Sequence, residues 1–192
     1  IPENLLESCV NLLSLDLNNN HLTTLPENLL KNCVNLAKFN LKHNKLETVS
    51  EKFFLHTVKI EKIDLSYNGY VQYPYNIFSH LNELKFLSLN NIKVPVPLLE
   101  NCKKLEELTL DILNFEDYCT KKLFENCTKI KNLHLGSFVY PIPFEILFLR
   151  DCNYFWFDEP FKNHDPWGTD HEKMKKHSIT ERFIKRKKTD NF

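Results

Sequence analysis

The residues of this chain best suited to chemistry are its six cysteines and eight histidines, which are common metal ligands and nucleophilic partners. Zinc sites use paired ligands such as C-x-x-C, and that motif does not occur here. His164, His171 and His177 follow Cys152, but their spacing matches no metal template. A nucleophile-elbow motif is also absent from the sequence. We therefore expect no metal, no cofactor and no catalytic residue, and we expect that the chain is not an enzyme.

Composition excludes further classes of function. The 192 residues include only three glycines, so no glycine-rich phosphate loop can be built. Lys+Arg and Asp+Glu number 25 each, so no overall charge favours nucleic acid. The longest apolar run, 139–149, is too short for a transmembrane helix and is interrupted by prolines. The chemistry of this chain must therefore lie in a surface that its secondary structure elements present.

A repeat organises those elements. Residues 1–12 and 25–36 read IPENLLESCVNL and LPENLLKNCVNL, and they match almost letter for letter at an offset of 24 residues. That period is typical of leucine-rich repeats, whose template is L-x-x-L-x-L-x-x-N/C-x-L. The template is matched six times within residues 1–140. The first residues of its six central L-x-L triplets are Leu15, Phe39, Ile63, Leu87, Leu108 and Leu133.

The L-x-L triplet alternates with a period of two, which predicts a short strand with its leucines facing inward. One repeat cannot bury its own apolar face, so neighbouring repeats must stack in parallel. The predicted fold is of the α/β class: a leucine-rich repeat solenoid, curved as a right-handed horseshoe, with a parallel β-sheet on the concave face. Apolar pairs such as Leu29-Leu30 and Phe53-Phe54 are expected to close the convex side from loops or short helices.

The position that follows each strand changes its character along the chain. Asparagine amides there can bond backbone groups that would otherwise be buried and unpaired. Apolar residues cannot, so we expect the later repeats to be less regular. The residues at this position are Asn20, Asn44, Asn68, Ile92, Leu113 and Phe138.

Four cysteines share one position of the repeat, three residues before its first leucine. They are Cys9, Cys33, Cys102 and Cys127, and other repeats place Thr57 and Leu81 there. A position shared with leucine is expected to be buried, where a free cysteine packs as a small hydrophobic side chain. Disulfides between neighbouring repeats stay open as an alternative.

The repeats predict a division of the chain into three parts. Residues 1–140 form the repeats, 141–170 an atypical terminal repeat or an aromatic cap, and 171–192 a basic tail. Residues 144–154 fit the template only 14 residues after the previous match, which is too short for a full coil. The tail holds eight Lys/Arg against three Asp/Glu, including KRKK at 185–188. A solvated tail, a nuclear address, a juxtamembrane patch and a patch for an acidic partner all stay open.

The repeat sequences VNLLSLDLNNNHLTTLPENLL and LFENCTKIKNLHLG resemble the ectodomain repeats of insect Toll-type receptors, over about residues 1–140. The resemblance implies ligand recognition in innate immunity or development, at the cell surface or outside the cell, by part of a longer receptor or by a soluble relative. The implied partner is a secreted cystine-knot cytokine of the Spätzle type. The alternative is an intracellular leucine-rich repeat scaffold, cytoplasmic or nuclear, with a basic C-terminal tail. The sequon Asn126-Cys127-Thr128 predicts a glycan on Asn126 in the extracellular setting.

The alternation of inward and outward residues along each predicted strand also indicates which side chains can face a partner. The residues between the inward leucines are polar throughout, so we expect no dry apolar groove on the sheet. They are Asp16, Asn40, Asp64, Ser88, Thr109 and His134. Mixed charges and two aromatic residues lie beside them, and aromatic residues in polar surroundings are typical anchors of protein interfaces. The predicted ligand-binding residues are Lys38, Lys42, Tyr67, Lys85 and Phe86, with Tyr67 and Phe86 as anchors.

Overall fold

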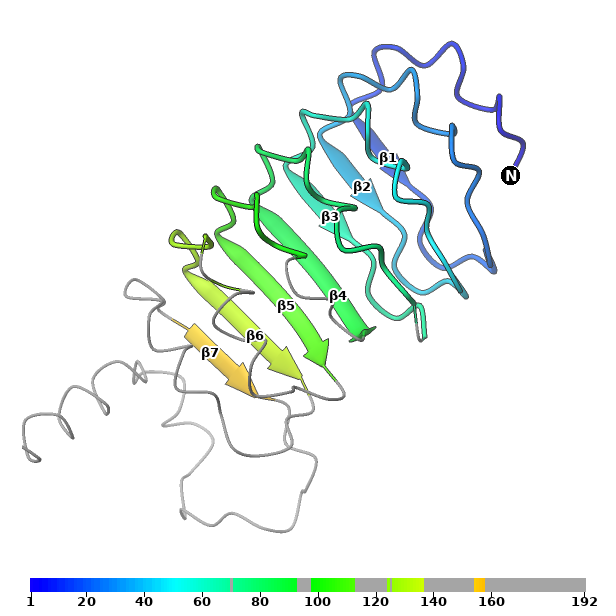
Figure 1. Ribbon diagram of the computed structural model, residues 1–192. Helices are drawn as coiled ribbons and strands as arrows, with labels where there is room; N and C mark the ends of the chain where they lie inside the picture. Colours follow the sequence, from blue (N-terminus) through cyan, green and yellow to red (C-terminus); the bar gives the residue numbers. More distant parts are fainter. Residues whose placement is uncertain (70, 93–97, 113–123, 125, 137–153, 158–192) are drawn as a thin grey trace, which may run out of the picture.

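The computed structural model of the chain describes residues 1–69, 71–92, 98–112, 124, 126–136 and 154–157. Within these residues seven strands form one sheet in chain order, and each pairs in parallel with the next (Figure 1). The strands are β1 (Ser14–Asp16), β2 (Lys38–Asn40), β3 (Lys62–Asp64), β4 (Phe86–Ile92), β5 (Glu107–Ile112), β6 (Asn132–Gly136) and β7 (Tyr154–Phe157). The stacked coils and the parallel sheet confirm the predicted solenoid.

The register of the sheet follows the repeat pattern. The inward triplet positions pair in the series Leu15, Phe39, Ile63, Leu87, Leu108 and Leu133. The polar positions between the leucines pair in the series Asp16, Asn40, Asp64, Ser88, Thr109 and His134. Both series are those predicted from the sequence. Each polar residue therefore has a neighbour of the same kind in the next coil.

The seventh strand extends both series, because Leu133 pairs with Phe155 and His134 with Trp156. It begins at Tyr154 and not at the template match near residue 144, so the spacing to the sixth strand is close to that of a full coil. The rest of the segments predicted as terminal repeat or cap (141–170) and as basic tail (171–192), including KRKK at 185–188, lies outside the described residues.

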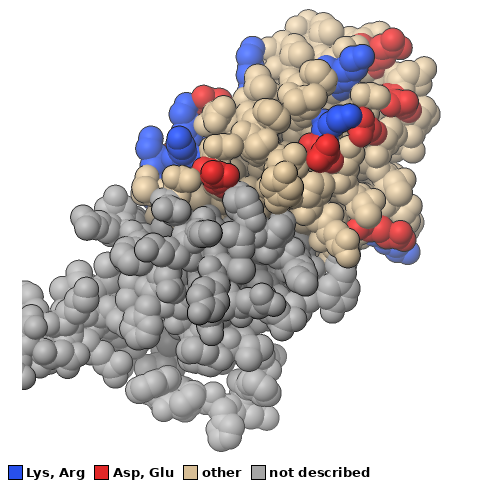
Figure 2. Space-filling model, in the orientation of Figure 1, with Lys and Arg blue, Asp and Glu red and all other residues tan. Residues whose placement is uncertain are grey.

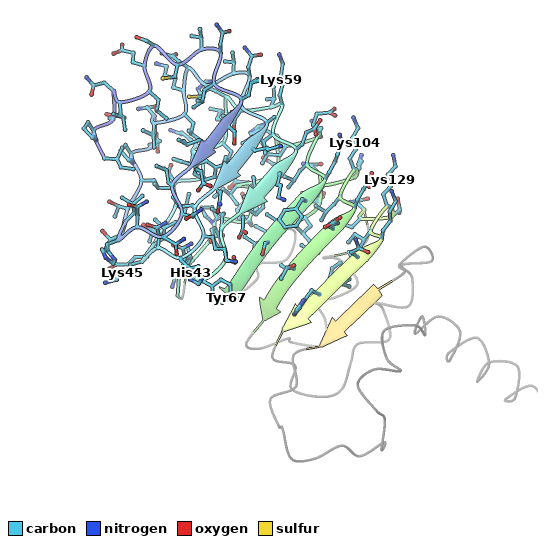
Figure 3. All side chains as sticks on the ribbon, turned by 180° about the vertical axis from the view of Figure 1, so that it is seen from behind. His43, Lys45, Lys59, Tyr67, Lys104 and Lys129 are labelled. Atoms are coloured by element: carbon cyan, nitrogen blue, oxygen red, sulfur yellow. The ribbon has the colours of Figure 1, made fainter. Side chains whose placement is uncertain are left out.

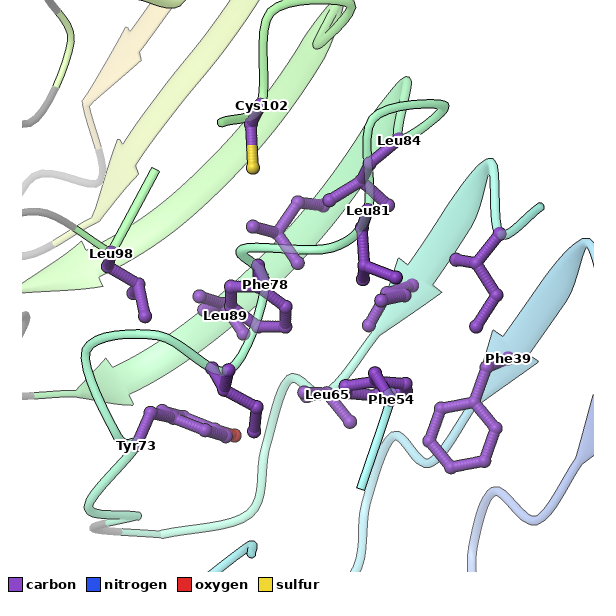
Figure 4. Packing of buried hydrophobic residues seen from close by; sticks show 14 of the residues in the cluster. Phe39, Phe54, Leu65, Tyr73, Phe78, Leu81, Leu84, Leu89, Leu98 and Cys102 are labelled. Atoms are coloured by element: carbon purple, nitrogen blue, oxygen red, sulfur yellow. The ribbon is translucent and has the colours of Figure 1, made fainter. Parts of the chain in front are cut away.

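The core is a continuous apolar column between the sheet and the return segments (Figure 4). Phe54 lies at its centre, with ring centroids 5.6 Å from Phe39 and 6.0 Å from Phe78. The pairs Leu29-Leu30 and Phe53-Phe54 are almost fully buried, as predicted for the side of the coil opposite the sheet. Each coil thus fills its neighbour's interior, which a single repeat could not do.

The return segments of the first four coils are chains of turns and not helices. Their backbone N–H groups bond the carbonyl three residues earlier, as in Leu29 N–H to Pro26 O (3.1 Å) and Cys33 N–H to Leu30 O (3.0 Å). Proline suits the first position of such a series, because it presets φ and needs no donor there. These turns bring the Leu29-Leu30 pair back onto the core.

The shared cysteine position is buried, as predicted. Cys33, Cys102 and Cys127 are at most 1 % exposed, and so are Thr57 and Leu81 at the same position. Cys9 in the first coil is half-buried, since the described residues place no coil on its outer side. Cys9, Cys33 and Cys102 form no disulfide among the described residues.

The asparagines that follow the strands form the predicted amide ladder. Asn44 Nδ2 donates to Leu17 O in the preceding coil (2.9 Å) and to Leu41 O in its own coil (3.1 Å), and Asn44 Oδ1 accepts from Leu22 N–H (3.0 Å). Asn68 repeats this pattern one coil later. Where Ile92 replaces asparagine, the strand runs on to that residue and the register shifts between Leu89 and Ile92.

The first coil shows what the stack does for an identical sequence. Leu5 and Leu29 occupy the same position of the duplicated segments, yet Leu5 is 55 % exposed and Leu29 is 2 % exposed. The first coil covers Leu29, and nothing in the described residues covers Leu5. Burial in this chain is therefore a property of neighbouring coils and not of one repeat.

Among the described residues, no helix has the length and apolar character needed to cross a bilayer.

Candidate functional site

The polar residues that end the first three strands cap the turns that follow those strands. In each case the side-chain oxygen Oδ1 accepts a hydrogen bond from the backbone N–H two residues later. The pairs are Asp16 with Asn18 (3.0 Å), Asn40 with Lys42 (3.1 Å) and Asp64 with Ser66 (3.0 Å). The sequence analysis missed this role, although the repeated Asp or Asn at strand ends is a signal for it. Part of the polarity of this face is thus used to shape its own edge.

In these three repeats, the third residue after the capping side chain adopts a left-handed backbone conformation. The φ values are 53° at Asn19, 54° at His43 and 57° at Tyr67. The N–H groups of Asn19 and His43 donate to Lys42 O and Ser66 O in the following coil, both at 3.0 Å. This conformation costs about 1–2 kcal/mol for residues other than glycine and asparagine. The stacked coils hold it, and it sets His43 and Tyr67 along the edge at which the strands end (Figure 3).

Tyr67 is the centre of a cluster at that edge. The His43 ring stacks on the Tyr67 ring with centroids 4.4 Å apart, and Lys42 Nζ lies 5.1 Å from the Tyr67 centroid. Tyr67 remains 50 % exposed, so one side of the ring is open to solvent. The structure therefore brings together the predicted residues Lys42 and Tyr67 and adds His43 to them.

A second cluster lies on the strands. Lys62 Nζ lies 4.3 Å from the centroid of the Phe86 ring, and Lys62 is the register partner of both Lys38 and Phe86. Lys38 and Lys62 are exposed, and Phe86 is half-buried. We call the two clusters together the aromatic–lysine surface, and it consists of Lys38, Lys42, His43, Lys62, Tyr67 and Phe86.

Lys85, the remaining residue predicted to bind a ligand, lies apart from this surface in an ion pair. Its Nζ is 3.0 Å from Glu61 Oε1, and this hydrogen bond raises the pKa of Lys85. Lys104 pairs in the same way with Glu83 (2.6 Å), and Lys131 with Glu106 (2.8 Å). Lys104 lies along the edge at which the strands begin (Figure 3). Lys85 thus joins two neighbouring coils at that edge.

Charged side chains of both signs are interspersed over the described part of the face drawn in Figure 2. No large patch of one sign is visible there, in keeping with the balanced composition. The described residues also contain no group of three or more side chains that could hold a metal ion.

Asn126, the predicted glycosylation site, lies in the return segment before β6 and is partly exposed. The next residue, Cys127, is buried and bonds Phe124 O through its N–H (2.9 Å). Asn126 is thus separated from the open face of the sheet by the core.

Comparison with known protein families agrees with the repeat register. A model of the leucine-rich repeat matches residues 10–69 and 35–91. A model of the BspA-type leucine-rich repeat region matches residues 76–149. Together these matches span most of the chain. The chain belongs to the leucine-rich repeat family. No curated relative matches it by sequence.

Solved leucine-rich repeat structures resemble the fold. The Toll–Spätzle complex, described as a hub in Drosophila development and innate immunity, aligns with a TM-score of 0.55 at 17 % identity, over 82 % of this chain and 28 % of that one. An internalin from Listeria monocytogenes aligns with a TM-score of 0.57 at 18 % identity, over 83 % of this chain and 46 % of that one. The chain thus spans less than half the length of either structure, and these likenesses show the fold.

Proposed function

We propose that this leucine-rich repeat chain is a protein-binding module and that it engages its partner through the aromatic–lysine surface. The observation that carries the proposal is the half-exposed Tyr67 ring, held in a left-handed turn between Lys42 and His43. Aromatic residues in polar surroundings contribute a large share of the binding energy in protein interfaces. The regular strands below the surface keep it rigid, which lowers the entropy lost on binding.

The proposed partner is a secreted cystine-knot cytokine of the Spätzle type, and the proposed setting is the cell surface or the extracellular space, within a longer receptor. Two observations support this proposal. The repeat sequences resemble insect Toll-type ectodomains, and the fold resembles a structure in which Toll is bound to Spätzle. In that setting Asn126 carries a glycan, on a return segment away from the proposed surface.

An intracellular leucine-rich repeat scaffold is the second candidate. The buried cysteines Cys33 and Cys102, which form no disulfide, favour it, because disulfides are rare in reducing compartments. In this candidate function the basic tail serves as an address or as a contact for a partner.

Glycan analysis distinguishes the two candidates. The chain is expressed through a secretory pathway, and its mass is compared with that of Asn126→Gln. The extracellular proposal predicts a mass shift in the parent that is lost in the variant. An efficiently secreted but unmodified parent favours the intracellular scaffold.

Binding measurements test the proposed surface. Calorimetry of a Spätzle-type cytokine with the parent chain is compared with Phe86→Ala and Tyr67→Asn, the latter because Asn19 already occupies the equivalent left-handed turn. Each variant is expected to weaken affinity about tenfold or more. Tyr75→Ala is the matched control, because Tyr75 is 62 % exposed on a return segment. Folded Tyr67 and Phe86 variants that bind like the parent would show that the proposed surface is wrong.

A further inference from the structure

The described lysines near the sheet fall into two groups according to what surrounds their ammonium groups. Lys85, Lys104 and Lys131, just before the strands, each pair with a glutamate of the preceding coil. Lys38, Lys42 and Lys62, on and after the strands, form no ion pair with any described carboxylate. The aromatic–lysine surface therefore presents cations that no carboxylate in the described part of the chain neutralises.

Two of these cations are positioned by aromatic rings instead. Lys62 lies over Phe86 and Lys42 over Tyr67, at 4.3 and 5.1 Å from the ring centroids. A ring attracts an ammonium group through its quadrupole but accepts none of its charge. Each ammonium has three N–H donors, and contact with a ring leaves donors available to an incoming carboxylate. The rings thus hold the lysines in place while their charge remains open to a ligand.

Carboxylates of the chain itself limit which anion can fit. Asp16 and Asp64 belong to the series of polar residues between the inward leucines, and in the sheet they lie on either side of Asn40. The Oδ1 atoms of both are bonded within their own turns, but their negative charge remains. A polyanion with closely and evenly spaced charges, such as heparin, would meet these carboxylates and be repelled. A peptide segment whose carboxylates are separated by apolar side chains would avoid this repulsion, because it can place apolar side chains beside Asp16 and Asp64.

We propose that the aromatic–lysine surface binds an acidic segment of a protein partner, laid across strands β2 to β4. Carboxylates of the segment pair with Lys38 and Lys62, which are neighbours in register, and an apolar side chain packs against Tyr67 or Phe86. This inference rests on the proposed protein-binding function and adds the chemistry of the segment that is recognised.

The test uses a random peptide library panned against the full chain, followed by affinity measurements on the selected synthetic peptides. The selected peptides are expected to be enriched in Asp and Glu together with aromatic or aliphatic residues. Lys38→Glu/Lys62→Glu is expected to weaken their binding about tenfold or more. The matched control is Lys31→Glu/Lys103→Glu, which changes the net charge equally at exposed lysines of the return segments and is expected to leave affinity unchanged.

The outcomes separate this inference from the proposed function. The selected peptides could lack acidic enrichment and still bind more weakly to Tyr67→Asn or Phe86→Ala. That result would contradict the proposed acidic segment but would still support the proposed binding surface. Heparin that binds as tightly as the peptides, and through Lys38 and Lys62, also overturns the acidic segment. If no selected peptide depends on any residue of the aromatic–lysine surface, both the inference and the proposed function are wrong.

Discussion

At the scale of single residues, the buried asparagines Asn44 and Asn68 connect neighbouring coils through hydrogen bonds inside the core. Asn68 Nδ2 donates to Leu41 O and Leu65 O, both at 2.9 Å, and Asn68 Oδ1 accepts from Leu46 N–H at 3.3 Å. Asn68 is 2 % exposed, so water cannot replace these bonds. Loss of the amide would leave several buried backbone groups without partners, and each such group costs about 1–3 kcal/mol.

Replacing Asn68 by alanine is therefore expected to lower the free energy of unfolding by about 2–4 kcal/mol. Chemical denaturation followed by circular dichroism measures the change. Asn20→Ala is the control, because Asn20 is exposed at the first coil and bonds only carbonyls of its own coil. Equal, small losses for the two variants would contradict the role assigned to the ladder.

Burial also determines the chemistry of the thiols. It raises the pKa of Cys127 to about 12, from an ordinary value of 9.0, and it raises the pKa of Cys102 as well. The folded chain keeps these thiols protonated while the unfolded chain ionises them above pH 9. Their contribution to stability is therefore present below pH 9 and is lost as the pH rises toward 12.

Maleimide labelling at pH 8 tests this burial. The reactive species is the thiolate, so Cys102 and Cys127 are expected to stay unmodified in the folded chain while half-buried Cys9 reacts. Peptide mapping by mass spectrometry assigns the labelled positions, and labelling in denaturant provides the reference. Rapid modification of Cys127 in the folded chain is incompatible with the buried position described above.

At the scale of secondary structure elements, six strands could be predicted because their inward residues repeat at nearly constant spacing. The register of Leu15, Phe39 and Ile63 follows from the L-x-L triplets alone. The seventh strand was not predicted, because Tyr154–Phe157 consists of four aromatic residues where the template expects leucines. Leu147 and Leu149 fit the leucine positions of the template, which placed the predicted repeat earlier in the chain. In the sheet, β6 pairs instead with Tyr154–Phe157.

The duplicated segments provide a prediction about stacking. Leu29→Ala is expected to cost about 2–4 kcal/mol of stability, because the side chain is buried against the first coil. Leu5→Ala removes the same atoms from the same position of the preceding repeat, where they are 55 % exposed, and is expected to cost less than about 1 kcal/mol. Thermal and chemical denaturation of the two variants measure the difference, and equal costs would mean that stacking does not bury this position.

At the scale of the whole molecule, the sequence predicts which residues lie between the inward leucines better than it predicts the contacts that each of these residues makes. Alternation correctly placed the polar column between the inward leucines, and Tyr67 and Lys42 do lie together. The ion pair that holds Lys85 could not be foreseen, because it depends on how closely Glu61 of the preceding coil approaches. The left-handed backbone conformation of Tyr67, with φ of 57°, likewise does not follow from the L-x-L triplets.

Hydrogen–deuterium exchange of the chain, with and without a bound Spätzle-type cytokine, tests the central claim most directly. The account predicts that added protection is concentrated at residues 38–43, 62–67 and 86–89, which carry the aromatic–lysine surface and the strands below it. The return segments 27–32, 51–56 and 75–80 are expected to exchange as they do in the free chain. Protection confined to those return segments would contradict the claim that the open face of the sheet binds the partner.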